Sequence, residues 1–127
     1  MAVNTEVRTV HEIGRAFAEA YARADIAGIE ELLHPEVHYR ELTPRKSVDS
    51  TGVEPIVDEV REFLGGYDGH ETVEISSGQV GTRAWARTRW LLKDGTTSAV
   101  VDWCQYMDVA EGRIRSLWLV CSGPMPV

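Results

Sequence analysis

The sequence predicts an α+β fold, with helices in the first half of the chain and a long antiparallel sheet in the second. The spacing of the apolar residues changes from a helical period to a period of two after Gly65-Gly66. All four tryptophans lie within residues 85–118, whereas residues 1–66 hold 13 acidic and 7 basic side chains. We therefore expect solvated helices first, followed by a sheet that is buried on more than one face.

Three helices account for the apolar stripes of the first half. The first stripe consists of Val7, Val10, Gly14, Phe17 and Tyr21. A shorter helix, Ile26 to Leu33, begins after Asp25 and ends at His34-Pro35, because the residue before proline disfavours helical geometry. A third helix begins near Thr51-Gly52-Val53-Glu54, which has the spacing of a capping box, and ends at Gly65-Gly66.

The strands are separated by a polar loop and by short turns. The expected strands are Val37 to Leu42, Glu71 to Ser76, Thr82 to Leu92, Thr96 to Val109 and Arg113 to Cys121. Residues 43–50 are expected to form a polar loop. The pairs Asp94-Gly95 and Glu111-Gly112 are typical of two-residue hairpin turns.

These two turns predict which side chains share a face of the sheet. A turn at Asp94-Gly95 pairs Arg87 with Asp102, and a turn at Glu111-Gly112 pairs Cys104 with Leu119. One face then carries Trp85, Arg87, Arg89, Val100, Asp102, Cys104, Tyr106, Leu117 and Leu119, a mixture that suits a pocket. The opposite face carries Ala84, Ala86, Trp90, Val101, Trp103, Gln105, Trp118 and Val120, which suits a helix or a second subunit. A four-residue loop would keep the faces and shift the partners, and a three-residue loop would swap the faces of one strand.

Composition limits the function further. We expect one domain over residues 1–127, and a net charge of −7 argues against a nucleic-acid partner. The absence of long apolar runs argues against a membrane partner or a secretory segment. Cys104 and Cys121 make neither a disulfide framework nor a zinc site, so a cytoplasmic protein with free thiols is expected. The 11 arginines and 2 lysines suggest a bacterial source with a high-GC genome.

The order of elements and several short segments resemble a known superfamily. The segments are Asp25 to Leu33, His34-Pro35-Glu36-Val37-His38-Tyr39, Gly52 at the start of a helix, and Glu111-Gly112-Arg113-Ile114. Together they resemble the NTF2-like superfamily, within it the SnoaL-like and ketosteroid-isomerase-like branch. The resemblance implies a cone-shaped fold in which three N-terminal helices pack on a curved, mostly antiparallel sheet that encloses a pocket. It also implies a homodimer through the outer face of the sheet, which we assign to the face with Trp103 and Trp118.

The resemblance also implies site residues. The general-base aspartate of ketosteroid isomerase falls on Glu41, its oxyanion-hole tyrosine on Phe17, and its protonated aspartate on Cys104, two residues after Asp102. Two of the three roles are altered, so a true ketosteroid isomerase is not expected. An arginine–aspartate pair is similar to the Asp-Arg-Asp set of limonene epoxide hydrolases, although Arg113 to Cys121 offers no second acid.

Glu41, Asp102 and Arg87 are the candidate catalytic residues. A carboxylate among apolar walls can move protons near neutral pH, so Glu41 is expected to be the base. Arg87 and Asp102 would handle the opposing charge. The alternatives are that Glu41 is a rim residue paired with Arg40 or Arg45, and that Asp102 and Arg87 form a structural ion pair.

The expected substrate-binding residues are Tyr39, Arg89, Trp85, Phe17, Tyr21, Cys104, Leu117 and Leu119. The aromatic members among them could equally be core residues, and Cys104 could be a small buried apolar residue. No metal is expected, because Pro35 breaks the helix that would align His34 with His38. No cofactor is expected either, since the chain has no glycine-rich phosphate loop or nucleotide motif.

The sequence thus predicts a small, cofactor-independent, SnoaL-like enzyme that performs acid–base chemistry. Cyclisation, isomerisation or dehydration of an apolar oxygenated small molecule, such as a polyketide or terpenoid, is the leading expectation. A non-catalytic small-molecule-binding or accessory dimeric protein is the first alternative, and an epoxide hydrolase-like activity is the second. Protein transport, the role of the superfamily's namesake, has no specific support.

Overall fold

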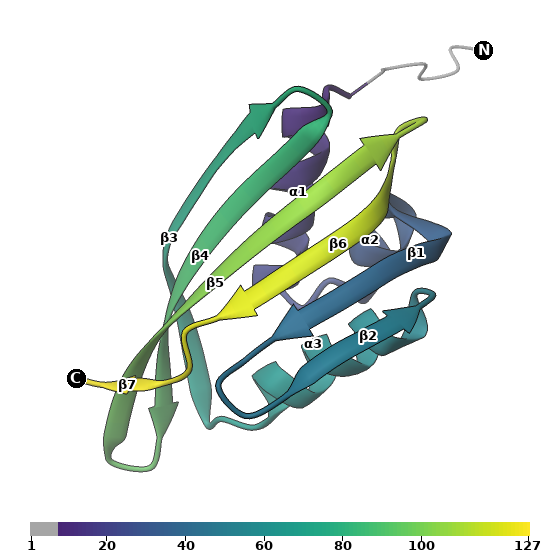
Figure 1. The fold of residues 1–127 in the computed structure, drawn as a ribbon. Coiled ribbons are helices and arrows are strands. Elements are labelled where there is room, and N and C mark those ends of the chain that lie inside the picture. Colours follow the sequence, from purple (N-terminus) through teal and green to yellow (C-terminus); the bar gives the residue numbers. More distant parts are fainter. Residues whose placement is uncertain (1–7) are drawn as a thin grey trace.

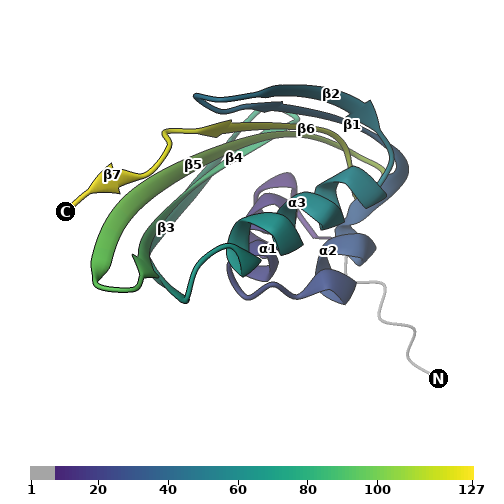
Figure 2. The ribbon, with the colours of Figure 1, turned by 90° about the horizontal axis from the view of Figure 1, so that it is seen from below.

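Within the part of the chain described by the computed structural model, residues 8–127, three helices lie against one face of a curved sheet (Figure 1). The helices are α1 (Val10–Ala22), α2 (Ile26–Leu32) and α3 (Glu54–Gly65). Figure 2 shows the sheet bending over the helices, so that its concave face is turned toward them. The predicted α+β fold, with three helices on a mostly antiparallel sheet, is confirmed.

The same residues form seven strands in one sheet. They are β1 (Leu33–Leu42), β2 (Ser47–Thr51), β3 (Gly69–Val80), β4 (Arg83–Asp94), β5 (Thr97–Ala110), β6 (Arg113–Cys121) and β7 (Met125–Pro126). Their order across the sheet is β2-β1-β6-β5-β4-β3, with β7 paired to β5. Strands β1 and β6 run parallel, and the other pairs are antiparallel.

The predicted loop at residues 43–50 is wrong in part, because β2 lies within it. Alternating side chains of β2 are polar and exposed, so the strand carries no apolar period that a sequence pattern could reveal. The hairpin is closed by Thr43, whose N–H donates to the carbonyl of Lys46 at 2.9 Å. Strand β1 also begins earlier than predicted, at Leu33, where α2 ends.

The helix starts differ from the predictions for reasons of capping. A capping box links Thr9 and Glu12: the Thr9 hydroxyl accepts from the Glu12 N–H, and the Glu12 carboxylate accepts from the Thr9 N–H. The helix therefore begins at Val10, and the predicted member Val7 lies outside the described residues. The capping box predicted near Thr51 is wrong, because Thr51 belongs to β2 and α3 begins after Val53 without a side-chain cap.

The core is an aromatic cluster between the concave face of the sheet and the helices. The ring of Tyr21 on α1 lies 5.9 Å from Trp90 and 5.3 Å from Trp103, and these two tryptophans are 5.5 Å apart. All three side chains are buried, as is Phe17 one turn before Tyr21. Aromatic pairs at such distances add to the free energy gained by burying their apolar area.

The two predicted hairpin turns differ in outcome. The turn at Glu111-Gly112 is confirmed, and both residues have the positive φ that a type I′ turn requires (55° and 78°). The other turn lies at Gly95-Thr96, because Asp94 pairs with Thr97. Each residue of β4 therefore pairs with a residue two positions further along β5 than predicted, which keeps the faces: Arg89 pairs with Asp102 and Arg87 pairs with Cys104.

A β-bulge at Arg115 reverses the predicted faces of β6. The pairing of β5 with β6 changes register between Asp108 and Val109, which leaves one extra residue on β6. Met107 therefore pairs with Leu117, and Tyr106 pairs with Trp118. Because side chains alternate along a strand, a one-residue shift moves every later side chain of β6 to the other face.

The faces of the sheet are accordingly corrected. Leu117 and Leu119 lie on the concave face with Trp103 and Gln105, and all four are buried. Trp118 and Val120 lie on the convex face with the outward residues of β4 and β5, which include Trp85, Arg87, Arg89, Asp102 and Cys104. Trp103 and Trp118, which were expected to form one dimer face, therefore lie on opposite sides of the sheet. No helix within residues 8–127 has both the length and the apolar character needed to cross a membrane.

Candidate functional site

A cavity of about 430 Å³ opens beside the concave face, between α3, the loop after β1 and the segment that follows β6. Its lining combines aromatic, charged and small residues: Thr43, Pro44, Arg45, Lys46, Glu59, Glu62, Phe63, Tyr67, Trp103, Cys121, Gly123 and Pro124. A hollow of this size with a few polar groups on apolar walls is typical of a small-molecule site.

Glu41 is a buried carboxylate that does not line this cavity and is separated from it by Lys46. Strand β1 turns Val37, Tyr39 and Glu41 toward the interior, and Glu41 is only 2% exposed. The hydroxyl of Tyr39 donates a hydrogen bond to Glu41 Oε1. Oε2 is buried and accepts no hydrogen bond within residues 8–127, so it is the oxygen left for further chemistry.

Lys46 connects Glu41 to the cavity. Its Nζ lies 3.5 Å from Glu41 Oε2 and donates to Glu59 Oε2 at 2.9 Å. Lys46 and Glu59 both line the cavity, and the Lys46 side chain is 42% exposed at its mouth. One ammonium group from the loop thus lies between two carboxylates from β1 and α3.

Burial and charge determine the protonation of these groups. Burial raises the pKa of Glu59, and the negative charge of Glu41 raises it further, against the opposing effect of Lys46. The hydrogen bond to Glu59 raises the pKa of Lys46, which keeps it charged. Burial, followed by the charge of nearby carboxylates, also raises the pKa of Tyr39 and Tyr21, so both phenols stay protonated and can donate.

The wall of the cavity is aromatic. The Phe63 ring lies 4.5 Å from Trp103, 5.3 Å from Trp90 and 5.8 Å from Tyr67. The Nε1 groups of both tryptophans and the hydroxyl of Tyr21 are buried without a hydrogen-bond partner within residues 8–127. Such groups are normally satisfied by water or by a ligand, so the interior keeps capacity to bind an oxygen-bearing molecule.

Six of the predicted site residues lie on this interior side of the sheet. Glu41, Tyr39, Phe17, Tyr21, Leu117 and Leu119 are all buried there. Glu41 is not a rim residue paired with Arg40 or Arg45, because its cation is Lys46, and Arg40 lies on the other face over the Trp118 ring at 4.6 Å.

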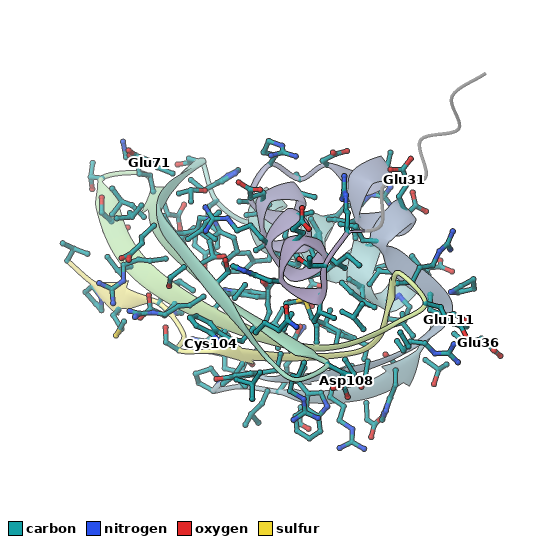
Figure 3. The ribbon with its side chains drawn as sticks, turned by 90° about the horizontal axis from the view of Figure 1, so that it is seen from above. Glu31, Glu36, Glu71, Cys104, Asp108 and Glu111 are labelled. Atoms are coloured by element: carbon teal, nitrogen blue, oxygen red, sulfur yellow. The ribbon has the colours of Figure 1, made fainter. Side chains whose placement is uncertain are left out.

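The other five predicted residues lie on the convex face, which corrects their expected place in the pocket. They are Asp102, Arg87, Arg89, Trp85 and Cys104. Figure 3 shows side chains on both sides of the sheet and labels Cys104 and Asp108 on this outer side of β5. The prediction placed Glu41 beside Arg87 and Asp102 because it reversed the faces of β6 relative to β5.

Asp102 instead forms an ion-pair cluster on the outer face. Arg89 binds it through two hydrogen bonds, with Nε at 2.7 Å and Nη2 at 2.9 Å, and Arg87 adds one at 3.1 Å. These bonds, chiefly those from Arg89, lower the pKa of Asp102. This geometry agrees with the alternative interpretation, in which Asp102 and Arg87 form a structural ion pair.

Sequence reasoning missed Lys46 and Glu59. Lys46 is one of two lysines in the chain, but its loop showed only polar residues. Glu59 lies three residues after Ile56 and four before Phe63, so it falls on the apolar stripe of α3. A carboxylate on an apolar stripe was the available signal, because such a position faces the interior of the fold.

Other features of the described residues are weaker candidates for a functional site. A hollow of about 420 Å³ on α1 is lined by Arg8, His11, Glu12, Arg15, Ala16 and Glu19, and none of these side chains is buried. Within residues 8–127, no group of three His, Cys, Asp or Glu side chains is placed to hold a metal ion.

Comparison with solved structures supports the fold. An NTF2-like protein from Burkholderia thailandensis is 19% identical with a TM-score of 0.74, covering 91% of this chain and 92% of that one. A protein from Pseudomonas putida assigned as a polyketide cyclase is 14% identical with a TM-score of 0.70, covering 88% and 90%. An epoxide hydrolase of the LEH-like kind from M. tuberculosis is 18% identical with a TM-score of 0.66, covering 89% and 82%.

No curated protein sequence matches the chain. The profile of the SnoaL-like domain matches residues 14–117, which is most of the sequence and includes β1, α3 and the long strands. The fold is similar to that of an NTF2-like protein, and the match in sequence over most of the chain shows that it belongs to the SnoaL-like family.

Proposed function

We propose that this protein is a cofactor-independent enzyme that uses Glu41 as a general base on an apolar oxygenated small molecule, such as a polyketide or terpenoid. The observation that supports it best is the buried Oε2 of Glu41, which has no hydrogen bond and lies next to Lys46 at the cavity wall. An unused carboxylate oxygen beside a cavity is costly for stability, and catalytic sites accept such costs.

The proposed chemistry is proton abstraction next to a carbonyl group. Glu41 Oε2 takes the proton from carbon, the electrons of the C–H bond form a C=C bond, and the carbonyl π electrons move onto oxygen. Tyr39 holds the other carboxylate oxygen through its hydroxyl, which fixes the direction of Oε2. Cyclisation, isomerisation and dehydration of carbonyl compounds can each proceed through the enolate that this step forms.

Lys46 takes the role that was assigned to Arg87 from the sequence. Its ammonium group lies at the cavity wall and next to Glu41, where it can stabilise the negative charge that develops on the substrate oxygen. The aromatic side chains of Phe63, Tyr67 and Trp103 provide flat apolar walls for the carbon skeleton.

The test is solvent-deuterium exchange into an enolisable bicyclic ketone, 2-tetralone, followed by mass spectrometry. Replacing a general base typically lowers the rate by about 10²–10⁴-fold. We therefore expect Glu41→Gln to lose exchange by that factor, while Glu36→Gln, on the exposed part of the same strand, keeps the wild-type rate. Binding of the ketone is followed by fluorescence of the tryptophans, since Trp103 lines the cavity.

Two other results would favour the alternative functions. If 2-tetralone binds and Glu41→Gln exchanges deuterium at the wild-type rate, a non-catalytic binding protein is the better description. Hydrolysis of a terpenoid epoxide to its diol, lost in Glu41→Gln, would instead favour an epoxide hydrolase-like activity. Two carboxylates and a cation at one cavity are compatible with that reaction.

We also propose that the protein forms a homodimer through the convex face of the sheet. That face exposes the apolar side chains of Leu42, Tyr106, Trp118 and Val120. Ion pairs such as Arg83 with Asp108 lie on the same face, so it carries both positive and negative charges. A twofold axis places a patch against its own copy, so a patch that carries both charge signs can be complementary to itself. The free thiols of Cys104 and Cys121 fit a reducing compartment such as the cytoplasm.

A further inference from the structure

Glu59, which lines the cavity, and the buried Glu41 share one ammonium group, that of Lys46. The Nζ of Lys46 is 3.5 Å from Glu41 Oε2 and 2.9 Å from Glu59 Oε2. The two oxygens therefore cannot be farther apart than the sum of these distances, 6.4 Å. A substrate in the cavity therefore contacts Glu59 directly, and it reaches Glu41 where the Lys46 side chain moves aside.

The surroundings of the two carboxylates differ. Glu41 is fully buried on β1, where it accepts a hydrogen bond from the Tyr39 hydroxyl and lies next to the ammonium of Lys46. Glu59 is on α3 with its side chain 13% exposed, and it faces the cavity directly. The charged or titratable groups around Glu59 are Lys46 and Arg45 from the loop, Glu41 and Tyr39 from β1, Tyr21 from α1, Glu62 from its own helix, and Cys121 from β6.

We propose that Glu59 is the acid of the site, which donates a proton to the substrate oxygen while Glu41 removes one from carbon, and that Lys46 is the positioning residue between them. This rests on the proposed function of Glu41. Glu59 loses its proton to the oxygen as the C–H proton moves to Glu41, so an enol forms with no net change of charge on the protein. Two carboxylates in different environments can divide the acid and base roles in this way.

The elevated pKa of Glu59 agrees with this geometry, since burial and the charge of Glu41 both favour its protonated form. Lys46 has the opposite effect and lowers the pKa of Glu59, which determines the direction of the change expected when Lys46 is replaced. Removing the ammonium group should raise the pH at which Glu59 loses its proton.

The first experiment needs no substrate. NMR of glutamate side chains labelled with carbon-13 follows the titration of Glu59 in the wild type, in Lys46→Met and in Lys46→Arg. We expect a midpoint above the ordinary value of 4.5 in the wild type, a further upward shift in Lys46→Met, and a midpoint close to wild type in Lys46→Arg. A wild-type midpoint at or below 4.5, or a midpoint that is unmoved in Lys46→Met, would overturn the proposal.

The second experiment is the pH dependence of deuterium exchange into 2-tetralone. The wild-type rate should fall at high pH as Glu59 loses its proton, and Glu59→Gln should lower the rate about 10²-fold and remove this high-pH limb. Glu59→Asp should restore the limb in part, because it keeps a titrating carboxyl group. Asp58→Asn is the control, as Asp58 is exposed on the same helix and lies outside the cavity lining.

The outcomes separate this proposal from the proposed function. If Glu41→Gln is inactive while Glu59→Gln keeps the wild-type rate and the high-pH limb, Glu59 is not the acid and the function of Glu41 stands. If Glu41→Gln is fully active, the proposed function fails first. Thermal unfolding of each variant confirms that it is folded.

Discussion

Asp102 shows how much a single residue depends on its neighbours across the sheet. Two arginines of β4 hold it with three hydrogen bonds on the convex face. Its folded pKa is lowered, so its ion pairs stabilise the protein above the unfolded pKa of about 3.8, and this contribution is lost as the pH falls through the folded value. Glu59 behaves in the opposite sense, because its raised pKa makes its ionisation unfavourable to folding as the pH rises.

Replacing Asp102 therefore has a pH-dependent effect on stability. We expect Asp102→Asn to lower the free energy of unfolding by about 1 kcal/mol near neutral pH, since ion pairs at exposed sites contribute little. The difference from wild type should be smaller in strong acid, because the carboxylate then takes up a proton, first in the unfolded state and at lower pH in the folded state. Urea unfolding at the two pH values measures it. An equal loss at both values would show that the hydrogen bonds, and not the charge, account for the effect.

At the scale of elements, the close packing of α1 on β4 depends on Gly14. A Cβ atom at this position would lie 2.6 Å from the Cβ of Ala84 and 3.3 Å from the end of Met107. The Ala84 methyl is fixed to the strand backbone and cannot rotate away. Helix α1 can therefore approach β4 this closely only at a position without a side chain.

Gly14→Ala should destabilise the protein, because overpacking costs about 1–3 kcal/mol and outweighs the higher helix propensity of alanine. Exchanging the two residues, in the double variant Gly14→Ala with Ala84→Gly, should recover part of the loss. Gly65→Ala is the matched control, since no atom lies within 4 Å of its added Cβ. Thermal unfolding of the four proteins compares them, and a stable Gly14→Ala variant would contradict the packing argument.

At the scale of the whole molecule, the convex face determines whether two copies associate. Trp118 is 45% exposed in the middle of this face, between the Arg40 guanidinium and the paired residue Tyr106. The curvature seen in Figure 2 turns this face away from the helices, so nothing in residues 8–127 covers it.

We expect the wild type to sediment as a dimer at micromolar concentration and Trp118→Glu to sediment as a monomer. A glutamate at the centre of an apolar interface would lose its hydration without a partner. Val73→Glu, at an exposed apolar residue on the edge strand β3, is the control and should stay dimeric. A monomeric wild type in sedimentation velocity would contradict the proposed association.

Much of the fold could be predicted from local patterns. The helical stripes, the change of period after Gly65-Gly66 and the Glu111-Gly112 turn specify α1, α3 and the long hairpins, because these signals lie within a few residues of the structure they produce. Glu41 could be placed inside for the same reason, since it alternates with Val37 and Tyr39 on one strand. The resemblance to SnoaL-like proteins, drawn from short segments together with the order of the elements, is confirmed by the family match over residues 14–117.

The tertiary structure determined which side chains lie next to one another in the candidate site. The bulge at Arg115 turns Trp118 outward and Leu117 inward. No local sequence motif predicts it, because a bulge depends on how two whole strands pair with each other. The bulge also places Arg87 and Asp102 on the opposite face of the sheet from Glu41. Lys46 and Glu59 reach Glu41 only because the loop after β1 and the second turn of α3 close over the same end of the sheet. The sequence by itself determined the elements and the inward carboxylate, and long-range packing chose the cation and the second acid that lie beside it.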